Sequence, residues 1–191
     1  MPNAHHIVLG DDPPTEELLE SLDAVLERID DELGVFFGDP ETEEVDGVTI
    51  RTFADLSEKG HTLTLIDDPQ VGRHIEADGD EGEAIARILT EALPAERPED
   101  LIARANDTRL PPDVLRVALS QPDEPSDDAA GVIVCALRSD DPDTIAAGIT
   151  GAAMTDPSRF ERDLQRLAAE ASDAGLRLMA EQALAGGGRG S

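Results

Sequence analysis

An excess of negative charge is the feature that most limits how this chain can fold. Asp and Glu together number 43 against 15 Lys and Arg, which gives a formal charge of -28 at pH 7. Repulsion among so many carboxylates expands a chain unless the burial of apolar surface outweighs it. Hydrophobic residues make up 39% of the sequence, and they recur at the spacings of helices and strands. The sequence therefore predicts a folded protein with an acidic surface.

The types of charged residue indicate an environment for this surface. The basic residues are 14 arginines and a single lysine, Lys59, while aspartates number 24. This composition resembles that of cytoplasmic proteins from extremely halophilic archaea, in which molar salt shortens the Debye length to roughly 3 Å. The single cysteine and the lack of a long apolar run also favour a cytoplasmic protein. An acidic protein that mimics nucleic acid or docks on a basic partner is the alternative interpretation.

Pro94 and Pro98 mark the expected boundary between two domains. Residues 1–94 contain a helix with strong 3.6-residue periodicity, several short alternating segments and a second helix. This order predicts an acidic α+β domain with a short antiparallel sheet and two helices. We expect strands at 6–10, 35–37, 48–53, 61–65 and 74–77, and helices at 15–33 and 80–93.

Residues 95–185 form the second predicted domain, which is entirely helical. This part holds nine of the fifteen basic residues, and several of its segments open with a proline or an aspartate. We expect helices at 98–105, 111–120, 126–138, 142–154, 157–171 and 173–185. The glycine-rich residues 186–191 are expected to be a disordered tail.

An internal repeat is suggested by a 31-residue offset within the helical domain. The offset aligns Val114 with Ile145 and Leu176, as expected where short helices stack to share a core. The last copy, residues 173–184, resembles the second helix of a HEAT repeat, with a starting Asp, an aliphatic–Arg pair and small alanines. This resemblance implies stacked helices of the kind that bind other proteins; only the last copy has the Arg. A plain helical bundle is the alternative.

The arginines of the helical domain are the expected contact residues. In a chain so poor in basic residues, they can form a less negative face that binds an acidic partner. Arg162 and Arg166 share one side of a predicted helix because they are four residues apart. We expect Arg104, Arg116, Arg162 and Arg166 to contact the partner, although pairing with nearby acids is the alternative.

Residues suited to catalysis or metal binding are sparse in this sequence. No motif for nucleophilic catalysis or phosphate binding occurs, and there are four histidines, no Trp and no Tyr. We therefore predict no catalytic residues and no cofactor. His61 and His74 are weak candidates for metal ligands, because their spacing matches no closed zinc site. Cys135 lies in an apolar helix and is expected to be a buried structural thiol.

Taken together, these features favour a non-enzymatic protein-interaction module. Its expected partner is another protein or a second copy of the chain, which implies a possible homo-oligomer, and neither nucleic acid nor a membrane is expected to bind. Two alternatives remain open. One is a small enzyme or ligand sensor with a pocket between sheet and helices, and the other is an acidic nucleic-acid mimic or inhibitor.

The charge excess generates a prediction about salt. The free energy of unfolding should rise between about 0.1 M and about 2 M KCl, because the Debye length falls from roughly 10 Å to below 3 Å and carboxylate repulsion is screened. Urea titrations followed by circular dichroism measure this change. NaCl should act like KCl, since screening depends on ionic strength. Equal stability at low and high salt would contradict the halophilic interpretation.

Overall fold

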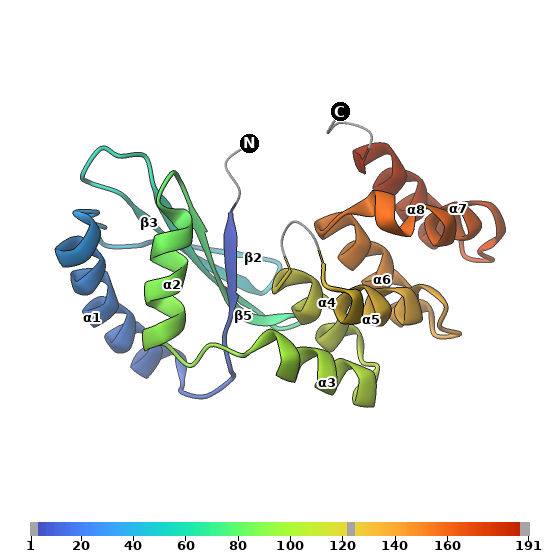
Figure 1. Ribbon diagram of the computed structural model, residues 1–191, viewed down its shortest axis with the longest axis horizontal. Coiled ribbons are helices and arrows are strands. Elements are labelled where there is room, and N and C mark those ends of the chain that lie inside the picture. Colours follow the sequence, from blue (N-terminus) through green and yellow to red (C-terminus); the bar gives the residue numbers. More distant parts are fainter. Residues whose placement is uncertain (1–3, 122–124, 188–191) are drawn as a thin grey trace. The chain divides into compact units, whose positions relative to one another are not determined.

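The computed structural model describes residues 4–121 and 125–187. Contacts divide the chain after Glu96 into two compact units, residues 1–96 and residues 97–191. This division lies two residues beyond the predicted boundary after Pro94. The first unit contains a sheet and the second consists of helices (Figure 1), so the predicted α+β class is confirmed.

The described part of the first unit forms a five-stranded antiparallel sheet with the strand order β1-β5-β4-β3-β2. The chain runs from β1 into helix α1, returns through a four-stranded meander, and ends in helix α2. The bounds are β1 (His5–Val8), α1 (Thr15–Leu33), β2 (Glu41–Val45), β3 (Val48–Ala54), β4 (Thr62–Asp68), β5 (Gly72–Asp78) and α2 (Gly82–Ala92).

One face of the sheet packs against α1 and α2 and builds the core of this unit. Because side chains alternate along a strand, Ile75 and Ala77 of β5 point to the helices together with Leu63 and Leu65 of β4. The apolar stripe of α1, which includes Leu22, completes this core. Gly34 ends α1 in the left-handed conformation, with φ 64°, as glycine does at many helix ends.

Two segments of the first unit differ from the sequence prediction. Residues 35–37 do not form a strand; Phe37 makes only an isolated bridge to Asp55. The segment β2 was missed because its five residues include three glutamates and all are exposed, so no apolar alternation marks it. Its pairing with β3, rather than burial of its side chains, makes it a strand.

Helices and one 3-10 turn make up the described part of the second unit. Prolines occupy the first turns of α3, α4 and α6. A backbone N–H in the first turn has no acceptor within the helix, so a proline there costs no hydrogen bond. The side chains of Ser126 and Asp141 cap α5 and α6. The bounds are α3 (Pro98–Thr108), α4 (Pro111–Leu119), α5 (Asp127–Leu137), α6 (Pro142–Met154), η1 (Pro157–Phe160), α7 (Glu161–Glu170) and α8 (Ala174–Gly187).

These helices contact one another in a regular order. Sequential pairs pack together as α3 with α4, α5 with α6 and α7 with α8, while α4 contacts α6 and α6 contacts α8. The positions related by the 31-residue offset, Val114, Ile145 and Leu176, lie on α4, α6 and α8.

The tail predicted from residue 186 starts too early, because Gly186 and Gly187 belong to α8. The remaining residues of the predicted tail lie outside the described part of the chain.

Close packing of α5 against α6 depends on a glycine. A Cβ atom added at Gly148 would lie 2.8 Å from the backbone nitrogen of Leu137 and 3.0 Å from the Cβ of Ala136. Atoms this close overlap, and the backbone of α5 cannot move away as a flexible side chain would.

No described helix is long and apolar enough to cross a membrane.

Alanine substitutions at two helical glycines test this packing. Gly148→Ala should lower the free energy of unfolding by about 1–3 kcal/mol, because it overpacks the α5–α6 contact. Gly131→Ala is the matched control: Gly131 is an exposed position of α5, and a Cβ added there would meet nothing within 4 Å. That change should raise the free energy of unfolding by about 0.5–1 kcal/mol, since alanine favours a helix. Denaturant titrations of both variants check the opposite signs.

Candidate functional site

Three arginines surround one aspartate on the helical unit. Asp163, Arg162 and Arg166 lie on α7, and Arg138 follows the last residue of α5. These four residues line an open hollow of about 500 Å³. We call them the arginine cluster.

Asp163 is held by two parallel hydrogen bonds from Arg138. The guanidinium donates from Nε to Oδ1 and from Nη2 to Oδ2, each at 2.8 Å. This bidentate geometry is the strongest that an Arg–carboxylate pair makes. The hydrogen bonds hold the pKa of Asp163 below its ordinary value although burial opposes the shift. The Asp163 side chain is 12% exposed and that of Arg138 is 59% exposed. The pair therefore joins a carboxylate on the buried face of α7 to a guanidinium at the surface.

The other two arginines occupy different surroundings. Arg166 donates from Nη2 to the Leu137 carbonyl at 2.8 Å, which satisfies an acceptor at the end of α5. The same nitrogen lies 3.8 Å from Oδ1 of Asp163. Arg162 is exposed, and its charge also lowers the pKa of Asp163. Three guanidinium groups thus share one buried carboxylate, which leaves a net positive charge at this point of a strongly acidic chain.

The other two predicted contact residues lie apart from the arginine cluster. Arg104 donates from Nε to Oδ1 of Asp113 at 2.7 Å, and this pair joins α3 to α4. Arg116 is only 7% exposed, so its guanidinium is not presented on the surface. Of the four predicted residues, the structure therefore brings together Arg162 and Arg166 only.

Arg138 was missed by the sequence analysis. It ends the predicted helix 126–138 and lies 25 residues before Asp163, so no local spacing joins the two. The aspartate is the stronger sequence signal: Asp163 falls among the buried positions of α7, beside Leu164 and Leu167. A carboxylate on the apolar face of a helix requires a partner from another element.

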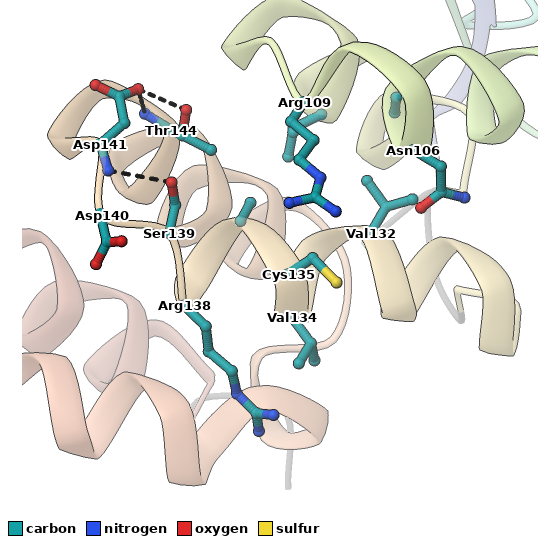
Figure 2. A pocket seen from close by; sticks show the side chains of 13 residues that line it. Asn106, Arg109, Val132, Val134, Cys135, Arg138, Ser139, Asp140, Asp141 and Thr144 are labelled. Atoms are coloured by element: carbon teal, nitrogen blue, oxygen red, sulfur yellow. Dashed lines mark hydrogen bonds between the residues drawn. The ribbon is translucent and has the colours of Figure 1, made fainter.

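A separate pocket of about 510 Å³ lies within the helical unit. Figure 2 shows Arg109 at the end of α3 and Cys135 and Val132 on α5, which line it from different helices. Cys135 is exposed, so its prediction as a buried thiol is wrong. Helix α5 is apolar around most of its circumference, and this position falls on the open side. All four histidines precede residue 97, so the pocket lining offers no imidazole.

The two histidines considered as weak metal ligands lie at different places in the sheet unit. His61 is buried directly before β4, and its Nε2 is 3.7 Å from a carboxylate oxygen of Glu81. His74 lies on β5 beside His6 and Glu76. Glu76 was missed as a possible ligand, although the sequence His-Ile-Glu places residues 74 and 76 on one face of a strand.

Comparisons with known proteins give no relative for this chain: no family model, curated protein or solved structure matches it.

Replacing Asp163 tests the central pair of the arginine cluster. Asp163→Asn should lower the free energy of unfolding by about 1–3 kcal/mol at pH 7, because it weakens charge-assisted hydrogen bonds at a nearly buried site. The pKa of Asp163 is depressed in the folded state. Its stabilising contribution is therefore complete above the unfolded pKa of about 3.9 and is lost as the pH falls through the lower folded value.

The difference between the original chain and this variant should accordingly narrow below about pH 4. Denaturant titrations from neutral to acid pH, in high salt, measure it. Asp107→Asn is the control because Asp107 is exposed on α3, and its effect should stay within about 0.5 kcal/mol. An equal loss in both variants, or a difference independent of pH, would refute the role given to Asp163.

Proposed function

We propose that this chain is a non-enzymatic protein-interaction module of a halophilic cytoplasm, which binds an acidic segment of a partner protein through Arg138, Arg162 and Arg166. The observation that carries the proposal is the arginine cluster, where three guanidinium groups gather around one carboxylate. Two of these residues, Arg162 and Arg166, belong to the set predicted from the sequence, and Arg138 replaces Arg104 and Arg116.

The donor chemistry of the cluster supports this choice. Each guanidinium has five N–H donors in a planar fork. Arg138 directs two nitrogens to Asp163, Arg166 directs one to Leu137, and Arg162 is exposed. Donors therefore remain for an external carboxylate, which arginine binds in a bidentate manner. Such short-range hydrogen bonds persist in salt that screens long-range attraction.

The order of helix contacts supports HEAT-like stacking as the framework for binding. Three sequential pairs pack side by side, and α4, α6 and α8 contact in succession, as repeated helical pairs do. Helix α5 contacts α7, and the two helices bring Arg138 and Arg162 to one hollow. The choice of an acidic protein segment as the partner rests on the hydrogen-bond donors of the arginines and on the resemblance of residues 173–184 to a HEAT-repeat helix.

A labelled peptide with a run of glutamates is the probe for this proposal. It should bind the chain in about 0.5 M KCl, and Arg162→Glu with Arg166→Glu should weaken binding at least about 10-fold, because repulsion replaces two attractive contacts. Fluorescence anisotropy measures the affinity. The control is Arg97→Glu with Arg109→Glu, which changes the charge equally at two exposed arginines outside the cluster.

The outcomes separate three possibilities. Loss of binding in the cluster variant alone supports the proposal. Equal loss in the control shows that net charge, rather than the cluster, governs binding, and no binding by the original chain overturns the proposal. Light scattering of the original chain and of the cluster variant tests whether the partner is a second copy of this chain. Self-association that disappears in the cluster variant identifies such a copy as the partner.

A further inference from the structure

Two histidines and a glutamate meet on the sheet of the first unit. His6 belongs to β1, while His74 and Glu76 belong to the neighbouring strand β5. One ring nitrogen of each histidine and one oxygen of Glu76 lie within 4.8 Å of one another. We call these residues the His–Glu triad. It is independent of the arginine cluster, which lies in the other unit.

The register of β1 and β5 explains why these residues meet. His6 is directly opposite Glu76, and Val8 is opposite His74. Cross-strand partners share a face, as do residues two apart on one strand. The triad consequently lies on the face away from α1 and α2, because the intervening Ile7 and Ile75 point into the core shared with those helices. Two paired strands fix all three positions, so the arrangement depends on no loop.

The distances suit a single small metal ion. Nδ1 of His6 is 3.4 Å from Oε1 of Glu76, and Nε2 of His74 is 3.8 Å from the same oxygen. Ligand atoms on a tetrahedral zinc ion are about 3.3 Å apart, given bonds of about 2.0–2.1 Å. The two separations from Oε1 are within about 0.5 Å of that spacing.

We propose that His6, His74 and Glu76 bind a divalent transition-metal ion of the zinc class. Neutral imidazole suits Zn²⁺, Co²⁺ and Ni²⁺, whereas Mg²⁺ and Ca²⁺ prefer oxygen ligands. Three protein ligands leave coordination positions for water or another small ligand. Its two imidazole nitrogens distinguish this site from the many exposed carboxylates, which attract cations without selecting among them.

Burial and exposure in the triad are arranged for such an ion. The side chain of His74 is 8% exposed and that of Glu76 is 35% exposed, so the carboxylate provides the open side by which an ion reaches the histidines.

The direct test is titration of the untagged chain with Zn²⁺ and Co²⁺ in high salt with excess Mg²⁺, which occupies the surface carboxylates. Calorimetry should give one site per chain, and Co²⁺ should produce a visible absorption band from nitrogen and oxygen ligands. His6→Ala and Glu76→Gln should each weaken Zn²⁺ binding at least about 10-fold, because loss of a ligand costs no less than loss of an outer hydrogen bond. Glu76→Gln keeps the side-chain size and so the fold.

Two matched controls use the remaining histidines. His5 pairs with Ala77 and points to the opposite face, and His61 lies beside Glu81. His5→Ala and His61→Ala should leave one Zn²⁺ site with unchanged affinity. The proposal is overturned if the triad variants bind Zn²⁺ as well as the controls do, or if Mg²⁺ displaces Zn²⁺ completely from the original chain. Circular dichroism confirms that each variant is folded.

Discussion

The fold depends on one balance: the burial of apolar side chains must outweigh the repulsion between surface carboxylates. Each unit achieves this with a hydrophobic core of its own. The first core joins Leu22 of α1, Ile75 of β5 and Ile88 of α2, and the second joins Ile133 of α5, Leu164 of α7 and Ala180 of α8. Both cores lie beneath surfaces rich in Asp and Glu, which like-charge repulsion would drive apart in dilute salt.

The arginines are used in this chain mainly where two elements must be joined. Arg104 connects α3 to α4 through Asp113, and Arg138 connects α5 to α7 through Asp163. Guanidinium suits these positions because it binds a carboxylate bidentately while its stem packs against apolar neighbours. The arginine cluster combines this structural role with an unusual local excess of positive charge, so in the proposed function the same residues would serve both folding and binding.

Most of the fold was predictable from the sequence because apolar periodicity determines it. The stripe of α1 and the alternation of β4 identify their elements without further information. Features that depend on partners distant in the sequence were not predictable. The strand β2 has no buried side chain, Cys135 faces outward from an apolar helix, and Arg138 meets Asp163 only after α5 and α7 pack. The His–Glu triad likewise needs the β1–β5 register, which no pattern within either strand reveals.

The exposed strand β2 has a further consequence. It forms one end of the sheet, and its residues Glu41–Val45 include three glutamates. The outer edge of a terminal strand is a template on which a strand from another molecule can be added. Dehydrating three closely spaced carboxylates discourages that addition even in brine, where repulsion is weak. An added strand would need basic residues at facing positions. The five described strands contain only two, Arg51 and Arg73, so copies of this chain are poorly suited to extend the sheet into a fibre.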